Sequence, residues 1–182
     1  IPISSGDLQK SSLIVKKGLT MVTHKYTLKD DASKYFNDPD TEDLLRSYMK
    51  SPYPCEKKLD YFPTYSNLLK QYRGKICTLV EVGVKEGGSL HMWREWLGKE
   101  ARIVGIDLNP ATKILEDDGF EIFIGDQAND YFLKECFNQL NGFDILIDDG
   151  GHKLHQQIMT INTALKFLKG KATILVEDTQ VS

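Results

Sequence analysis

Several features that define large protein classes are missing from this sequence. Its three cysteines, Cys55, Cys77 and Cys136, are an odd number without C-x-x-C spacing. They are typical of reduced thiols in a cytoplasmic protein, not of a disulfide framework. No apolar run approaches the roughly 20 residues of a membrane span, so no membrane partner is expected.

Neither sign of charge dominates. The chain has 23 basic and 26 acidic residues, giving a net charge of −3, and they are spread along its length. This balance gives no electrostatic footprint for nucleic acid. The opening "IPISSGDLQK" lacks both a signal-peptide layout and an initiator Met, so we expect the chain to begin inside a longer one. With 182 residues, 41% of them apolar, it is long enough for one domain with a core.

Apolar, β-branched runs recur from about residue 75 onward. They cover residues 76–84, 101–108, 120–126, 143–149 and 172–178. Their near-continuous apolar character is typical of strands buried on both faces of a parallel sheet. Helical patterns lie between them, so we predict a doubly wound α/β fold with a mostly parallel, Rossmann-like sheet. The chain ends just after the fifth run, where we expect the sheet to be truncated.

Three segments between the runs have helical periodicity. They are 89–99, with Ser89 as the expected N-cap, 130–142, ending at Gly142, and 155–170, ending at Gly170. In the last segment Ile158, Ile161, Leu165 and Leu168 are expected to form the buried face. Helical spacing favours a core position for Trp93 over a role as a substrate platform.

The first 74 residues are more polar. A helix is plausible at 40–50, capped by Asp40 or Thr41, and another over "PTYSNLLKQYRG" (63–74). We interpret residues 1–74 as an N-terminal appendage or lid on a core formed by 75–182.

The stretch "LVEVGVKEGGS" (79–89) follows the first strand with glycines at 83 and 87. A dinucleotide fold would have G-x-G-x-x-G there, which argues against a nicotinamide-dependent oxidoreductase. We expect Gly83 and Gly87 to let the backbone approach a ligand. The acid at Glu81 suits a ligand with positive charge.

Carboxylates also end the next two strands. Asp107 stands where such folds grip ribose hydroxyls, and Asp126 where a carboxylate can receive an adenine amino group. Either residue alone could be a helix N-cap. Together with the acid and the glycines of 79–89, they predict a cationic adenosyl cofactor, S-adenosylmethionine.

The motifs "VEVGVKEGGS", "GIDLNP", "IGDQ" and "IDDGGH" resemble the successive motifs of class I S-adenosylmethionine-dependent methyltransferases. Combined with a later "VEDT", they resemble the metal-dependent sugar O-methyltransferases of macrolide biosynthesis and the related cephalosporin-hydroxylase-like group. The resemblance covers roughly residues 60–182. It implies O-methyl transfer to a hydroxyl of a sugar or glycosylated natural product, with a small-molecule acceptor as partner. It also implies that Ser89 and the loop before it face the amino-acid part of the cofactor.

Four carboxylates, Asp148, Asp149, Glu177 and Asp178, fall at the ends of the fourth and fifth strands. They would repel one another, and Lys153 is the only cation within these motifs. Mg²⁺ held by oxygen ligands would resolve the conflict. The resemblance assigns Asp149, Glu177 and Asp178 as metal ligands and places Asp148 beside the methionine end of the cofactor.

His152, in "DDGGH", corresponds to the general base of the resembled enzymes. An unperturbed pKa near 6.5 suits that role at neutral pH. His155 is more simply a solvated helix residue. A zinc site built from the two histidines is disfavoured by their hard oxygen neighbours.

Other interpretations stay open. The chain could be a non-catalytic adenosyl- or nucleotide-binding module of a larger biosynthetic protein. Tyr61 and Tyr65 could form an edge of the cofactor or acceptor pocket. A homo-oligomer is compatible with the sequence.

Overall fold

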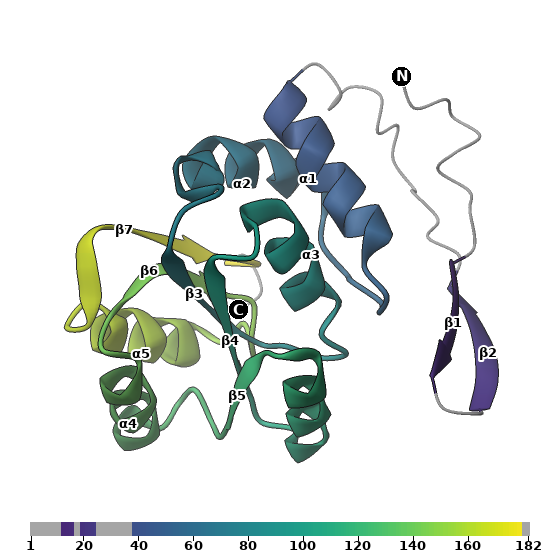
Figure 1. Cartoon of the computed structure of the whole chain (residues 1–182). Coiled ribbons are helices and arrows are strands. Elements are labelled where there is room, and N and C mark those ends of the chain that lie inside the picture. The colour runs from purple at the N-terminus through teal and green to yellow at the C-terminus, as the bar shows by residue number, and fades with distance from the viewer. Residues whose placement is uncertain (1–11, 17–18, 25–37, 180–182) are drawn as a thin grey trace.

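The computed structural model describes residues 12–16, 19–24 and 38–179. The first two ranges form an antiparallel hairpin of β1 (Ser12–Lys16) and β2 (Leu19–His24). The rest of the predicted lid before residue 38 lies outside the described residues. Residues 38–179 form a central sheet with helices on both faces (Figure 1).

The sheet has five strands in the order β5-β4-β3-β6-β7, and every neighbouring pair is parallel. The strands are β3 (Cys77–Val82), β4 (Ala101–Asp107), β5 (Glu121–Ile124), β6 (Phe143–Asp148) and β7 (Leu168–Val176). All six residues of β3 are buried, as expected for the central strand. The predicted doubly wound parallel fold is confirmed.

One face of the sheet is covered by α1 (Pro39–Lys50), α2 (Phe62–Leu69) and α3 (Gly88–Leu97). The short 3₁₀ segments η3 (Leu59–Tyr61) and η4 (Lys70–Tyr72) flank α2. Both helices predicted before residue 75 are present. The cap of the first is Asp38, whose carboxylate accepts from the Thr41 amide at 2.9 Å. Trp93 is fully buried in this core, as predicted.

The other face is covered by α4 (Asp130–Leu140) and α5 (Leu154–Ala164). Helix α4 ends at Leu140, two residues before the predicted end at Gly142, because Asn141 is left-handed, at φ 55°, and caps it. Between β4 and β5 lies a nine-residue 3₁₀ segment, η5 (Pro110–Asp118).

Helix α5 differs from its prediction in length and orientation. It ends at Ala164, and Gly170 lies inside β7. The residues that α5 buries are Gln157, Thr160, Thr163 and Ala164. Ile158 and Leu165 are exposed, so the apolar periodicity does not mark the buried face.

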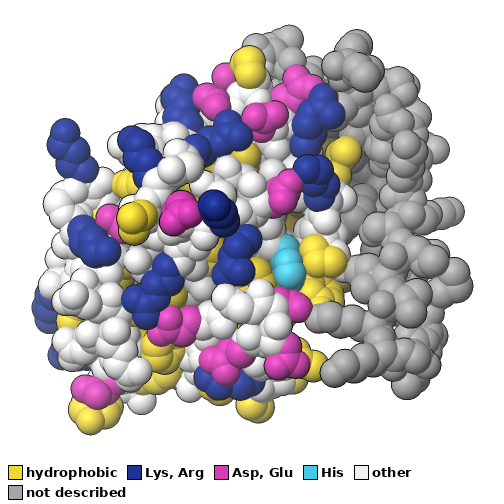
Figure 2. All heavy atoms as spheres, viewed as in Figure 1, with side chains coloured by type: hydrophobic (Ala, Val, Ile, Leu, Met, Phe, Trp, Pro, Cys, Tyr) yellow, Lys and Arg dark blue, Asp and Glu magenta, His cyan; other side chains and the backbone are white. Residues whose placement is uncertain are grey.

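The sheet order places the carboxyl ends of all five strands along one edge. The chain runs outward from β3 to β5 and then crosses over to β6, and ligands bind at such a switch point in doubly wound folds. Basic and acidic side chains are interspersed on the face shown in Figure 2. Every helix in the described ranges is too short or too polar to cross a bilayer.

Candidate active site

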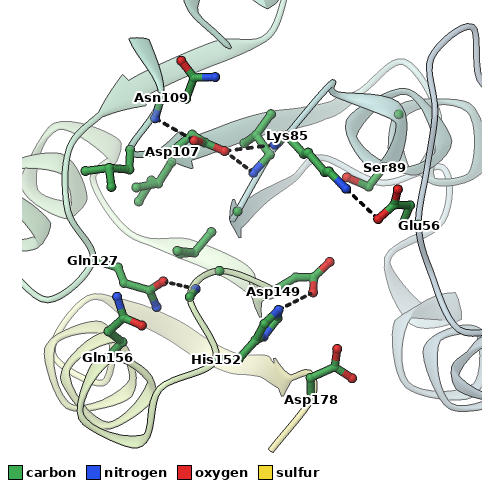
Figure 3. A pocket seen from close by; sticks show the side chains of 18 of the residues that line it. Glu56, Lys85, Ser89, Asp107, Asn109, Gln127, Asp149, His152, Gln156 and Asp178 are labelled. Carbon is green, nitrogen blue, oxygen red and sulfur yellow. Dashed lines mark hydrogen bonds and ion pairs between the residues drawn. The ribbon is translucent and has the colours of Figure 1, made fainter. Parts of the chain in front are cut away.

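A cleft of about 510 Å³ opens at the carboxyl ends of the central strands. Seven of the predicted site residues line it: Gly83, Ser89, Asp107, Asp126, Asp149, His152 and Asp178. Four others lie outside its lining: Glu81, Gly87, Asp148 and Glu177. Asp107 and Asn109 lie at one end of the cleft, whereas Asp149, His152 and Asp178 converge at the other (Figure 3).

Asp107 organises the loop after β3. One carboxylate oxygen accepts from the backbone amides of Val84 and Lys85, at 2.7 and 2.9 Å. The other carboxylate oxygen accepts from the backbone amide of Asn109 at 2.8 Å. The N-cap of η5 is Asn109 itself, so Asp107 is not a helix cap. Its carboxylate is only partly buried and remains on the cleft wall.

Asp126 follows β5 and is exposed at the cleft. It accepts from the Ala128 amide at 2.8 Å. Helix α4 is capped by Asn129, which accepts from the Phe132 amide. The capping alternative therefore fails for Asp126 too, and its carboxylate can face a ligand.

The glycines of the loop are required by contacts within the protein. Gly83 has φ 87°, and a Cβ there would overlap the carbonyl of Asp149. A Cβ at Gly87 would overlap the Leu115 side chain. The close contacts found at these glycines are with the loop after β6 and with η5, and the approach to a ligand stays a prediction.

Ser89 and Glu81 form a buried pair. Helix α3 has Gly87 as its N-cap residue, not Ser89. The Ser89 hydroxyl instead donates to Glu81 at 2.7 Å. Glu81 is fully buried, so it can act on a ligand only through its neighbours.

An internal lysine separates the carboxylates. The Lys57 ammonium lies 2.9 Å from Glu81, 2.6 Å from Asp149 and 2.8 Å from Glu177. Its side chain is 2% exposed. The sequence offered only Lys153 as a nearby cation. The structure corrects this, because Lys57 arrives from the segment between α1 and η3 and neutralises part of the negative charge.

The charges of this group are strongly coupled. Burial by itself would lower the pKa of Lys57, but the three surrounding carboxylates outweigh it and raise that pKa well above its ordinary value. Burial raises the pKa of Glu177 to about 7, against the opposing effect of Lys57. The lysine is therefore a permanent cation at this point.

Asp148 is fully buried and binds a residue that the sequence did not single out. The Gln127 amide donates to its two oxygens at 3.1 and 3.3 Å. Burial raises the pKa of Asp148, and the Gln127 hydrogen bond opposes the shift. Gln127 also accepts from the Gly151 amide at 2.7 Å, so it ties β6 to the "DDGGH" loop.

Within the described residues, Asp149, His152 and Asp178 are the group that could hold a metal ion. Their ligand atoms all lie within 4.8 Å of one another. Glu177 is not a member of this group and pairs with Lys57 instead. His155 also lies outside the group. Asp178 also accepts from Lys58 and, at 2.8 Å, from the Tyr61 hydroxyl. The Lys58 hydrogen bond is the main reason that the pKa of Asp178 is lowered.

Three cleft residues have left-handed backbone. Lys85, His152 and Asp178 have φ of 52°, 56° and 51°. Such conformations are costly for residues other than glycine and concentrate at functional sites. Among the described atoms, the buried Nδ1 of His152 has no hydrogen-bond partner. Its Nε2 lies 3.9 Å from Asp149.

A second cleft of about 450 Å³ adjoins the first through Asp178, which lines both. Tyr61 and Tyr65 line it together with Lys58, Asp60 and Thr64. The two tyrosines named from the sequence therefore belong to this second cleft.

Known proteins match this chain at the level of both sequence and fold. Demethylmacrocin O-methyltransferase of Streptomyces fradiae is 29% identical over 135 residues, covering 70% of this chain and 33% of the relative. A tetracenomycin rhamnosyl 3'-O-methyltransferase of Streptomyces olivaceus is 28% identical over 125 residues, 65% of this chain and 32% of the relative. The chain thus spans about a third of the length of these relatives.

Among solved structures, the MycE methyltransferase of mycinamycin biosynthesis, in complex with Mg, SAH and mycinamycin VI, has a TM-score of 0.66 at 21% identity. The match covers 92% of this chain and 53% of MycE. That likeness shows the shared fold. A family model described as a methyltransferase domain matches residues 80–179, which include the whole strand-end edge and more than half of the chain. The chain belongs to this methyltransferase-domain family.

Proposed function

We propose that this chain carries the cofactor-binding part of an S-adenosylmethionine-dependent O-methyltransferase. We further propose that the enzyme uses Mg²⁺ and methylates a hydroxyl of a sugar or glycosylated natural product. The observation that carries the proposal is the arrangement of one cleft. Asp107 and Asp126 lie on its adenosyl side, and Asp149, His152 and Asp178 converge on its other side.

The adenosyl side fits the cofactor in size and chemistry. A volume of about 510 Å³ is within the range of small-molecule sites. Asp107 would hold the ribose hydroxyls and Asp126 the adenine amino group. Leu108, which is 70% exposed on the cleft wall, offers an apolar surface that a purine ring would cover.

The metal side fits a hard divalent cation. Asp149 and Asp178 offer carboxylate oxygens, which Mg²⁺ prefers. Glu177, the third predicted ligand, could join them only if its carboxylate turned away from Lys57. A bound cofactor would supply the methyl group that the acceptor oxygen takes. A bound cation would supply positive charge beside that oxygen.

His152 is suited to remove the proton from the acceptor hydroxyl. It borders Asp149, and an imidazole is an effective general base near neutral pH. The remaining contribution of the protein is to hold the hydroxyl and the methyl group in line, which by itself lowers the barrier substantially.

The acceptor would occupy the second cleft. Tyr61 and Tyr65 offer aromatic faces, and Asp60, Thr64 and Asp178 offer hydrogen-bonding groups. This mixture suits a hydroxylated ring. The two Streptomyces relatives are named for O-methylation of demethylmacrocin and of a rhamnosyl-tetracenomycin, which supports a natural-product acceptor of this kind.

Calorimetric titration of S-adenosylhomocysteine into the full-length protein, with and without Mg²⁺, tests the proposal. We expect binding by the wild type and a loss of about tenfold or more in Asp107→Ala, because hydrogen bonds to a charged group disappear. Asp149→Ala should keep the affinity for S-adenosylhomocysteine and lose any effect of Mg²⁺ on the titration. A folded protein that does not bind S-adenosylhomocysteine contradicts the proposal. Binding without any Mg²⁺ response would favour the non-catalytic adenosyl-binding module.

A further inference from the structure

Asp149 divides its two carboxylate oxygens between different partners. Oδ2 accepts from the Lys57 ammonium at 2.6 Å, whereas Oδ1 faces His152, whose Nε2 lies 3.9 Å away. A carboxylate held at one oxygen presents the other in a fixed direction. The direction in this case is toward His152 and Asp178 (Figure 3).

Lys57 is itself held on every side. Glu81 and Glu177 bind the same ammonium from the ends of β3 and β7, and Glu81 is fixed in turn by Ser89. The ammonium cannot leave this place without leaving buried carboxylates unpaired, which would be costly.

The backbone that carries Lys57 is also anchored. The Tyr48 hydroxyl donates to the carbonyl of Cys55 at 2.9 Å. The Ser51 hydroxyl donates to the carbonyl of Gly88 at 2.8 Å. Pro54 packs so closely on the start of α3 that a Cβ at Gly88 would overlap its carbonyl.

The neighbouring lysine contrasts with Lys57. Lys58 pairs with Asp178, but its side chain is 57% exposed. Water can solvate the Lys58 ammonium when a metal ion takes its place at Asp178. Lys57 has no such access to solvent, so its ammonium stays in place when a metal ion replaces Lys58 at Asp178.

We propose that Lys57 is a positioning residue that locks Asp149 so that its outer oxygen faces a divalent cation shared with Asp178. This inference rests on the proposed metal site. Partners that orient a metal-binding side chain are known to affect metal affinity by about 10–100-fold.

Binding of Mn²⁺ to the full-length protein, followed by electron paramagnetic resonance without acceptor, tests the role of Lys57. Mn²⁺ accepts the same oxygen ligands as Mg²⁺. We expect Lys57→Met to weaken Mn²⁺ binding by about tenfold or more, with a smaller change in affinity for S-adenosylhomocysteine. The matched control is Lys50→Met, which removes a surface lysine paired with Glu95 and should leave both affinities unchanged.

A second comparison guards against misfolding of Lys57→Met. The double variant Lys57→Met/Glu81→Gln removes one buried charge of each sign and still leaves Asp149 without its partner. It should bind Mn²⁺ about tenfold more weakly than Glu81→Gln alone. Equal or tighter Mn²⁺ binding in the Lys57 variants overturns the inference alone. A wild-type protein that binds no Mn²⁺ overturns the metal site and the inference together.

Discussion

Glu177 shows how one buried residue couples the site to the stability of the fold. Its carboxyl pairs with the buried Lys57 ammonium and lines the second cleft, and burial raises its pKa from 4.5 to about 7. Between these values the folded state keeps a proton that the unfolded state releases. The stability contributed by this group is therefore complete below pH 4.5 and is lost as the pH rises through about 7.

Replacing Glu177 by Gln should flatten this pH dependence. In the presence of a chelator, we expect the free energy of unfolding of Glu177→Gln to change less between pH 5 and 8 than that of the wild type, by on the order of 2 kcal/mol. Urea denaturation at several pH values measures it. Glu95→Gln, at an exposed ion pair, is the control and should show the same change of unfolding free energy with pH as the wild type. If the unfolding free energy of Glu177→Gln changed with pH as much as that of the wild type, Glu177 would not be the source of the pH dependence.

Sequence reasoning located the residues that follow strands but missed the residues brought to them by tertiary packing. Asp107, Asp126 and Asp149 could be named because the carboxyl ends of parallel strands meet at one edge. Lys57 stands in the charged run "CEKKLD", between the exposed Glu56 and Lys58. It is buried in alternation with Cys55 and Leu59, but a lysine in such a position does not by itself indicate burial. Its burial follows from the three carboxylates that surround it and from the contacts of its segment with α1 and α3.

At the scale of elements, the site depends on the contact between the loops after β3 and β6. The Gly83 amide donates to the carbonyl of Ile106, and the Asp149 amide donates to the carbonyl of Val82. The two loops meet where Gly83 touches Asp149. Any side chain at residue 83 would push apart the adenosyl and metal sides of the cleft.

Gly83→Ala should therefore be more damaging than an alanine at another left-handed glycine. Gly74 has φ 67°, and a Cβ added there would meet no atom within 4 Å. Gly74→Ala should therefore cost only the free energy of holding alanine in a left-handed conformation, about 1–2 kcal/mol. Gly83→Ala should add an overlap cost of about 1–3 kcal/mol. Urea denaturation of both variants compares them. Equal destabilisation would mean that the loops separate without cost.

Helix α5 shows the limit of periodicity as a guide to burial. Its larger apolar residues suggested a buried face, but the sheet accepts the small and polar face of Thr160, Thr163 and Ala164. The Gln157 amide donates to the carbonyl of Glu177 at 3.0 Å. Polar residues can be buried here because Gln157 and Thr160 bind the strand-end loops and Thr163 binds Asp130 of α4. The sequence pattern does not reveal these partners.

Two substitutions at the C-terminal end of α5, one at its cap residue Leu165 and one at Ala164, distinguish these faces in the 182-residue chain. Leu165→Lys, at an exposed position, should change the free energy of unfolding by less than about 0.5 kcal/mol. Ala164→Leu, at a fully buried position, should overpack the core and cost about 1–3 kcal/mol. Chemical denaturation measures both. The reverse order of effects would mean that α5 packs by its apolar face.

At the scale of the whole molecule, α1 and α2 share a core with the sheet. Leu44, Phe62 and Tyr65 belong to the same buried group as Trp93 and Ile103. Strand and helix alternation was enough to predict the sheet and its strand-end cleft. The contribution of α1 and α2 to the core was harder to foresee, because charged residues and prolines separate the apolar positions of their segment.

Leu44→Ala should consequently destabilise the molecule as one unit. The side chain is fully buried, so we expect a loss of about 2–5 kcal/mol. Tryptophan fluorescence, which reports on α3, and far-ultraviolet circular dichroism should give coincident transitions. Separate transitions would mean that α1 and α2 unfold independently of the sheet.

The most direct test of the proposed site is a crystal structure of the full-length protein with S-adenosylhomocysteine and Mn²⁺, located by its anomalous signal. We predict the ribose at Asp107, the adenine beside Asp126, and Mn²⁺ bound by Asp149 and Asp178 with Lys57 still in place behind them. Ligand density elsewhere, or Mn²⁺ displacing the Lys57 ammonium, would contradict this account.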